Sequence, residues 1–431
     1  MPCTEGWEVA KAVGYLPATI SLQYWSGGQL NASFGPWSIS MRLKGMGGSF
    51  RCLGQKPGLK LKFPSGRRPY GLKKLTLNNM VGDYSMVHEV LSYDVFRSLS
   101  VAAPRTMYAQ VTLNGVYQGI YLEVETMDDV ALRRWFASTQ HLYEGTYGAW
   151  WGPVSDPFSA HYEVDEGNTT NRNDLQRLLD TAQDFAPGWY SRMSPLADLD
   201  QMTRFWAAEW FVGQWDGYLN RINNYYLHSD ANGRFSMMPW GTDWSMTTEE
   251  ASVGSLIPIY PSPVPTGRYL MDGCLADPIC HAMYMDALAL LASRWSGWRL
   301  AERADTLYSI VAAESGGVDT VKEFIASRLP KYATWLQTLP RAPICLMIES
   351  VLAGQLSVSW VPSSSLVVPI TGYAIQYANG TGALRRFALG PEAREFTLTG
   401  LVAGTNDTVR VRSIFSLAAS NKTCVTSLPV R

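Results

Sequence analysis

The sequence lacks the features that would place it in a membrane or in contact with nucleic acid. No apolar run approaches the roughly 18 residues that a membrane-spanning helix needs. The 36 Lys and Arg residues are balanced by 37 Asp and Glu residues. Nucleic acids and anionic membranes both select for a basic excess, so neither is expected as a partner. The N-terminal stretch also lacks the charged-then-apolar pattern of a signal peptide.

Motifs of the common catalytic classes are missing as well. There is no Walker A loop, no His-Glu-x-x-His motif and no Gly-x-Ser-x-Gly motif, and the five histidines are scattered. No Cys-x-x-Cys pair occurs among the six cysteines, which argues against a structural zinc site. Classical serine hydrolases and zinc proteases are therefore unsupported.

What is present is the composition of a globular protein with two or three domains. Of the 431 residues, 46% are hydrophobic and 12% aromatic. The even cysteine count fits disulfide bonds; Cys274 and Cys280 form a reasonable local pair, whereas the pairing of Cys3 and Cys52 stays open. Glycosylation sequons begin at Asn31, Asn168, Asn379, Asn406 and Asn421. Together these features favour a secreted or cell-surface glycoprotein.

A domain boundary is expected at 339–343, Leu-Pro-Arg-Ala-Pro, because two prolines end a helix and begin an extended segment. Helices and strands alternate in residues 1–338, whereas short strands of period two fill residues 343–431. The sequence therefore predicts an α+β domain followed by an all-β sandwich. Within the first domain, Pro330 is expected to break the last pair of helices.

A glycine-rich turn between two alternating strands is the first candidate part of a site. The strands are expected at 38–45 and 58–63. The turn contains three glycines, Gly45, Gly47 and Gly48. Glycines allow close approach to phosphates, and Lys60 and Lys62 share one face of the second strand and could pair with them. The alternative is an ordinary hairpin turn beside a solvated strand face.

Four further residues follow in the order in which a kinase presents its catalytic parts. Glu89, in a helix expected at 85–99, could hold the lysine in position. Asp216 lies in a loop where it could receive a hydroxyl proton, and Asn224 could bind metal. Asp243 is expected at a strand end, where a carboxylate suits Mg²⁺. Each residue alone could be a surface carboxylate or a turn former, and only the order is informative.

Longer segments resemble the CotH kinase family. RLKGMGGSFRCLGQKPGLKLKF at 42–63 resembles a family segment, and the block 78–125 is similar almost throughout. WDGYLNRINNYYLH at 215–228 and RFSMMPWGTDWSM at 234–246 look like its catalytic-loop and metal-site segments. The resemblance implies an atypical, two-lobed protein-kinase-like fold. It also implies transfer of the γ-phosphoryl group of ATP to serine or threonine of a protein substrate, with Mg²⁺ or Mn²⁺.

The resemblance also assigns roles to individual residues. By position, the resemblance implies that Lys62, or alternatively Lys60, contacts phosphate, and that Glu89 or Asp94 is the acidic partner of this lysine. Asp216 would be the catalytic aspartate, and Asn224 and Asp243 would bind the metal. The family usually has Asp-x-Asp after Pro-Trp, but here the first position is Gly241. The loss of one metal contact would favour a second hypothesis, a catalytically weak or inactive CotH-like surface adhesin.

Residues 343–431 resemble a fibronectin type III domain. Three of its core positions are filled as expected, by Trp360, Tyr373 and Leu401. Asp407 stands where that family has a corner tyrosine, and Cys345 and Cys424 could form a clasp between the first and last strands. Such a sandwich is expected to bind a partner or to act as a spacer.

Overall fold

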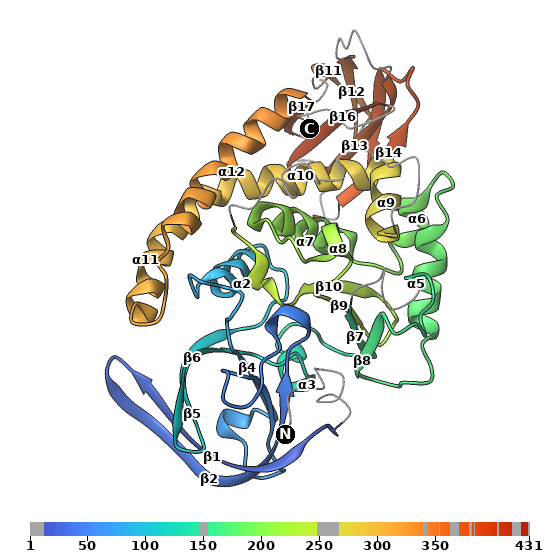
Figure 1. The fold of residues 1–431 in the computed structure, drawn as a ribbon. Helices are drawn as coiled ribbons and strands as arrows, with labels where there is room; N and C mark the ends of the chain where they lie inside the picture. The colour runs from blue at the N-terminus through green and yellow to red at the C-terminus, as the bar shows by residue number, and fades with distance from the viewer. Residues whose placement is uncertain are drawn as a thin grey trace.

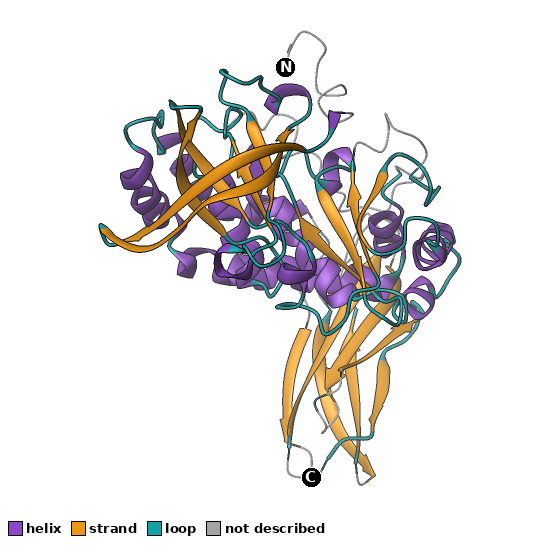
Figure 2. Cartoon of the chain, turned by 90° about the horizontal axis from the view of Figure 1, so that it is seen from below, coloured by secondary structure: helices purple, strands orange, loops and turns teal. Residues whose placement is uncertain are grey.

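The computed structural model describes residues 13–146, 154–247 and 267–338, and most of the C-terminal part. The described C-terminal residues are 343–352, 354–362, 370–378, 382, 384–402, 405–415 and 424–429. Helices cross the middle of the molecule, with one large sheet on one side and the strands of the C-terminal part on the other (Figures 1 and 2). The expected α+β domain and all-β sandwich are both confirmed.

The first sheet is antiparallel, with strand order β1-β2-β3-β4-β6-β5. Its strands are β1 (Leu16–Ser26), β2 (Gln29–Lys44), β3 (Gly58–Lys62), β4 (Lys74–Asn78), β5 (Thr106–Leu113) and β6 (Val116–Val124). Alternation along β3 and β4 buries Leu59, Leu61, Leu75 and Leu77 in a small core on one face. The polar side chains of these strands therefore share the opposite face, which turns toward the rest of the domain. The predicted β5–β6 hairpin is confirmed, with Asn114 in its turn at φ 50°.

Helix α2 (His88–Ser98) follows the sheet and is buried along most of its length. The Asp83 carboxylate organises its start, accepting hydrogen bonds from the backbone N–H groups of Ser85 at 3.0 Å and His88 at 2.7 Å. Asp83 therefore fixes the backbone of the turn that leads into the helix. As a result, Glu89 lies in the first turn of a fixed helix.

The second half of the domain combines a four-stranded sheet with a helical core. The sheet has order β10-β9-β7-β8, from β7 (His141–Gly145), β8 (Tyr162–Glu166), β9 (Tyr225–Ser229) and β10 (Phe235–Pro239). The helices are α3 (Asp129–Leu132), α5 (Asn173–Gln183), α6 (Trp189–Met193), α7 (Leu199–Val212), α8 (Tyr218–Arg221), α9 (Tyr269–Ala276), α10 (Pro278–Trp295), α11 (Leu300–Val311) and α12 (Asp319–Thr338). Helix α7 is buried almost throughout and ends just before the loop that carries Asp216.

The prediction that Pro330 breaks a helix is wrong, because α12 continues through it. A proline inside a helix removes one backbone hydrogen bond, which tertiary packing can offset. Phe324, Ile325 and Tyr332 are buried on either side of Pro330, and the Tyr332 ring lies 5.6 Å from that of Phe211 in α7. Burial of this apolar face keeps the helix continuous.

The C-terminal sandwich packs directly on the helical core. Its sheets are β11-β12-β15 and β14-β13-β16-β17, from β11 (Ile344–Leu352), β12 (Gln355–Val361), β13 (Ile370–Ala378), β14 (Leu384–Leu389), β15 (Glu395–Thr399), β16 (Asn406–Phe415) and β17 (Cys424–Pro429). As expected, its core holds Trp360, Tyr373 and Leu401. Ala374 and Ile414 join the core of the first domain, and the buried Arg412 donates to Asp286 of α10 at 2.7 Å. This face of the sandwich is thus occupied by the chain itself.

The structure shows the bonding state of Cys52, Cys274 and Cys280. The local disulfide between Cys274 and Cys280 is confirmed, and Cys52 is also disulfide-bonded. Cys3 and the side chains of Cys345, Cys424 and Asp407 lie outside the described part of the chain.

Within the described ranges, no single helix has both the length and the apolar character to cross a bilayer. One pair of helices in these ranges meets the test on length and composition when taken together. It consists of Tyr269–Ala276 and Pro278–Trp298, which meet at a bend of 104°.

The Arg412–Asp286 contact predicts that the sandwich stabilises the first domain. Replacement of Asp286 by Ala removes the carboxylate partner of a buried guanidinium and should lower the free energy of unfolding by about 1–3 kcal/mol. Glu302→Ala is the control, because the Arg299–Glu302 pair is exposed and such pairs contribute about 0–1 kcal/mol. Urea denaturation measures both. Equal effects of the two substitutions would show that the interface adds no stability.

Candidate functional site

A cavity of about 350 Å³ lies between the polar face of the first sheet and the loops that follow α7 and β10. Its lining joins segments that are far apart in the sequence: the glycine turn, β3, α2, the loop at 215–224 and the segment 240–244. The candidate residues Gly45, Gly48, Lys60, Glu89, Asp216, Asn224 and Asp243 all line it. Residues separated by about two hundred positions are therefore brought into one site.

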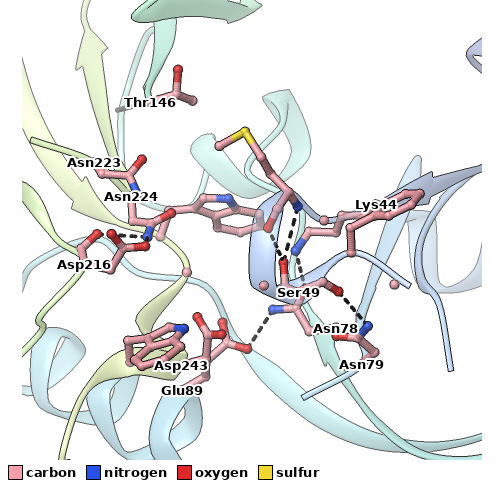
Figure 3. A pocket seen from close by; sticks show the side chains of 18 of the residues that line it. Lys44, Ser49, Asn78, Asn79, Glu89, Thr146, Asp216, Asn223, Asn224 and Asp243 are labelled. Carbon is pink, nitrogen blue, oxygen red and sulfur yellow. Dashed lines mark hydrogen bonds between the residues drawn. The ribbon is translucent and has the colours of Figure 1, made fainter. Parts of the chain in front are cut away.

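A lysine that was not among the candidates lies in the charged part of this cavity. Lys44, the last residue of β2, donates through Nζ to Oδ1 of Asn78, and Nδ2 of Asn78 donates to Oε2 of Glu89 at 2.7 Å (Figure 3). The hydroxyl of Tyr93 donates to the other Glu89 oxygen at 3.1 Å. Asn78 thus connects a partly buried amine to a buried carboxylate and holds both in fixed positions.

Burial disfavours the charged forms of Lys44 and Glu89. Burial lowers the pKa of Lys44 and raises the pKa of Glu89, and the attraction between the two residues opposes both shifts. Lys44 Nζ also lies 5.5 Å from the centre of the Trp240 ring, in a cation–π arrangement. The amine therefore has a carboxylate and an aromatic face as neighbours.

Asp243 lies beside Glu89 in the cavity (Figure 3). It belongs to the 3-10 turn Thr242–Trp244 that follows β10, and its backbone carbonyl is bound by the His88 imidazole at 2.9 Å. The pKa of the Asp243 carboxyl is raised to about 8, mainly by burial and also by the negative charge of Glu89, while Lys44 opposes the shift. A positive charge placed between these carboxylates would be strongly stabilised.

Asp216 and Asn224 form the third wall. Nδ2 of Asn224 donates to both the backbone carbonyl and Oδ2 of Asp216, each at 2.9 Å. Glu209 of α7 fixes the intervening helix α8, because its two carboxylate oxygens accept the backbone N–H groups of Tyr218 at 2.6 Å and Leu219 at 2.9 Å. The catalytic-loop candidate is therefore anchored to the most buried helix of the domain.

Gly241, the position at which the chain departs from the Asp-x-Asp pattern, is adapted to having no side chain. Its φ is 52°, in the left-handed region, and a Cβ atom would lie 2.8 Å from Oδ1 of Asn224. An acidic residue at 241 would therefore need Asn224 to move.

Only some of the glycines and lysines predicted to contact phosphate line the cavity. Gly45 and Gly48 line the cavity, whereas Gly47 begins the 3-10 turn Gly47–Ser49 beside it. Lys60 also lines the cavity. Lys62, the preferred phosphate contact, is exposed at the far end of β3 opposite Lys74 and is not among the lining residues. Both lysines share one face, as alternation predicts, but Lys62 lies two residues farther from the turn.

Sequence reasoning missed Lys44, Asn78 and Glu144, which also line the cavity. For Lys44 a signal existed, because it directly precedes Gly45 and its strand alternates. The register pairs Arg42 with Lys60 and Lys44 with Gly58, which places Lys44 on the same face as Lys60. Asp94, the alternative to Glu89, instead pairs with Arg97 and Arg303 away from the cavity.

The oxygen donors of the cavity suit a divalent cation held jointly with phosphate. In the described ranges no group of three or more His, Cys, Asp and Glu side chains is arranged to hold a metal ion by itself. Asn224 and Asp243 nevertheless present the hard oxygen ligands that Mg²⁺ prefers, and Mg²⁺ commonly completes its coordination with substrate phosphates and water. These residues could therefore hold Mg²⁺ or Mn²⁺ when a phosphate ligand is present.

The environment of Gly241 predicts that even a methyl group is harmful there. Gly241→Ala combines a left-handed backbone with a contact to Asn224 and should cost about 1–2 kcal/mol in the free energy of unfolding. Gly297→Ala is the control, since a Cβ atom there meets nothing within 4 Å and the backbone is not left-handed. Urea denaturation of both variants gives the comparison. A neutral Gly241→Ala would contradict the assigned geometry.

The chain is similar to known proteins in both sequence and structure comparisons. It is 27% identical over 183 residues to inner spore coat protein H of Bacillus subtilis (strain 168), covering 40% of this chain and 50% of that protein. The chain thus matches about half the length of this relative. Among solved structures, "Myokine structure" is 22% identical, with 21% of this chain and 97% of that chain covered and a TM-score of 0.19. The sixth fibronectin type III domain of a human fibronectin type III domain containing protein is 19% identical, with 21% and 85% covered and a TM-score of 0.20.

Family models account for nearly the whole chain. The fibronectin type III domain model matches residues 342–423, and the model described as CotH kinase protein matches residues 42–339. The second match covers more than half of the chain and includes every residue that lines the cavity. The chain therefore belongs to the CotH kinase protein family and carries a C-terminal fibronectin type III domain.

Proposed function

We propose that this protein is a kinase that transfers the γ-phosphoryl group of ATP to serine or threonine residues of other proteins, with Mg²⁺ or Mn²⁺. The observation that carries the proposal is the convergence of Lys44, Glu89, Asp216 and Asp243 on one cavity. A lysine with its acidic partner, a loop aspartate and a strand-end aspartate are the parts that phosphoryl transfer requires.

In this proposal the first sheet binds the triphosphate. Lys44 pairs with phosphate oxygens, while Asn78 and Glu89 keep its amine aimed into the cavity. Gly45 is at φ 111°, and a Cβ atom there would lie 3.1 Å from the backbone of Phe50, so only glycine permits this tight turn. Lys60 supplies a second positive charge on the same face.

The opposite wall acts on the acceptor. Asp216 accepts the hydrogen bond of the acceptor hydroxyl and orients its oxygen for in-line attack, and Asn224 holds the Asp216 carboxylate in place. A divalent cation bound at Asn224 and Asp243 would neutralise the phosphate charge. Because the carboxylates are fixed by the protein, little reorganisation is needed when charge develops.

We further propose that the protein acts outside the cytosol, on secreted or surface proteins. The Cys274–Cys280 disulfide supports an oxidising compartment. Asn31 and Asn168 of the predicted sequons are exposed, while Asn379, Asn421 and the side chain of Asn406 lie outside the described part. A binding partner of the fibronectin type III domain would have to use a face other than that packed on α10.

The competing function is a catalytically inactive surface adhesin. Gly241 favours it, because the family resemblance implies an acidic residue at this position and glycine has no side chain to bind a metal. The two functions differ in whether the cavity binds ATP with a divalent cation.

The charge placement predicts which lysine matters for nucleotide binding. ATP with Mg²⁺ should raise the midpoint of thermal unfolding of the wild type, since a ligand at about 100 times its Kd stabilises by about 2.7 kcal/mol. Lys44→Met should abolish most of this shift, whereas Lys62→Met, the matched control, should retain it. An adhesin would show no shift in the wild type, and equal losses in both variants would contradict the placement of Lys44.

Asp216 is predicted to be needed for transfer and not for nucleotide binding. Asp216→Asn should lower the rate of phosphate transfer by about 10²–10⁴-fold, the usual contribution of a positioned general base. The thermal shift with ATP and Mg²⁺ should persist, because Asn is isosteric. Asp180→Asn, on the exposed side of α5, is the control. Transfer at the wild-type rate by Asp216→Asn, measured with labelled ATP, would end this assignment.

A further inference from the structure

The corner between α11 and α12 reaches across to the first sheet and contacts it through one carboxylate. Oε2 of Glu314 accepts the backbone N–H of Ile120 at 2.8 Å, and Oε1 accepts the Tyr117 hydroxyl at 2.7 Å. The Lys56 ammonium lies 3.8 Å from Oε2. A residue more than two hundred positions from the glycine turn is thereby attached to the loop that follows this turn.

The sheet is shaped to receive this carboxylate. The pairing of β5 with β6 shifts register between Val111 and Thr112, opposite Gly119, and this irregularity lies directly before Ile120. Gly119 has φ 99°, and a Cβ atom there would lie 2.6 Å from Oε2 of Glu314. Only glycine therefore lets the Glu314 carboxylate reach the Ile120 N–H.

From Glu314 the contacts continue to the cavity. The backbone carbonyl of Lys56 accepts a hydrogen bond from Nδ2 of Asn79 at 2.9 Å, and the same nitrogen donates to the carbonyl of Ser49 at 3.0 Å. Ser49 ends the 3-10 turn of the glycine segment, and both Ser49 and Asn79 line the cavity. The position of the glycine turn thus depends on where Lys56 is held.

The same corner also fixes the segment that begins α2. The Ser315 hydroxyl donates to the carbonyl of Ser85 at 2.8 Å, and the N–H of Gly316 donates to the carbonyl of Tyr84 at 2.9 Å. These residues immediately follow Asp83, which organises the start of the helix that carries Glu89. Helix α11 itself lies beside α2 (Figure 1), and Arg303 of α11 contacts Asp94 of α2 at 3.3 Å.

We propose that the corner at 312–318 acts as a clamp: its contacts hold the glycine turn and α2 in fixed positions relative to the loop that carries Asp216. Glu314 is the positioning residue of this clamp. The clamp can transmit position because α12 packs on α7, where the Tyr332 ring lies 6.1 Å from Trp210. Glu314 touches neither nucleotide nor acceptor, and acts through Lys56 and Ile120. The inference rests on the proposed kinase function for its catalytic consequence and on contacts alone for its structural one.

The test compares Glu314→Ala and Glu314→Gln with Glu302→Ala, an exposed glutamate of α11 that pairs with Arg299. Amide hydrogen exchange is followed in segments 45–57 and 83–90, and kinetics are measured against ATP. Glu314→Ala should speed exchange in both segments and raise the KM for ATP about tenfold, as expected for the loss of a charged hydrogen bond, with a smaller change in kcat. Glu314→Gln should be intermediate, because it retains an acceptor for Ile120 but loses the charge facing Lys56.

The possible outcomes separate this inference from the proposed function. Faster exchange in Glu314→Ala supports the clamp even if the wild type transfers no phosphate, in which case the proposed function fails alone. Unchanged exchange in both segments, with an unchanged KM for ATP, overturns the clamp. If Glu314→Ala does not fold, Lys56→Met decides, since it removes the charged contact and keeps the backbone bond to Asn79. Faster exchange in 45–57 supports the clamp, and wild-type exchange overturns it.

Discussion

The buried contact between Lys44 and Glu89 through Asn78 is the interaction on which the site depends. Two opposite charges removed from water lose hydration that only close pairing and hydrogen bonds can restore. Asn78 provides a hydrogen bond to each charge, because its amide oxygen accepts from the lysine and its amide nitrogen donates to the carboxylate. Asp243 adds a further carboxylate to the same space, and its pKa is raised mainly by burial and also by the negative charge of Glu89. Such an arrangement is costly in a free protein, and the proposed binding of ATP with a divalent cation would offset this cost.

The rest of the domain serves to hold that group in one geometry. Alternation in β3 places leucines in a small core on one face and leaves Lys60, on the other face, lining the cavity. Helix α2 is fixed at its start by Asp83, and the loop of Asp216 is fixed by Glu209 from the buried helix α7. The corner after α11 then contacts both the loop beyond the glycine turn and the start of α2. The cavity is thus built from elements that are each anchored independently.

The fibronectin type III domain is better described as a packed extension of the helical core than as a free spacer. Ala374 and Ile414 belong to the same hydrophobic cluster as the helices, and Arg412 reaches Asp286 from a buried position. The match to the CotH kinase protein family spans every residue that lines the cavity, Gly241 among them. The left-handed backbone of Gly241 and its contact distance to Asn224 show that the surrounding residues are adapted to glycine.

The sequence by itself determined the elements whose signal is local. The Asn114-Gly115 hairpin, the alternation in β3, the strands of the sandwich and the order Glu89, Asp216, Asn224, Asp243 were all predictable from spacing and residue type. Tertiary structure alone decided the rest. Lys44 rather than Lys62 faces Glu89 because strand register and distance along the strand set what a side chain reaches, and Pro330 stays inside α12 because packing on α7 outweighs a lost hydrogen bond. Local patterns specify which face a residue occupies, but only the folded chain specifies what lies opposite it.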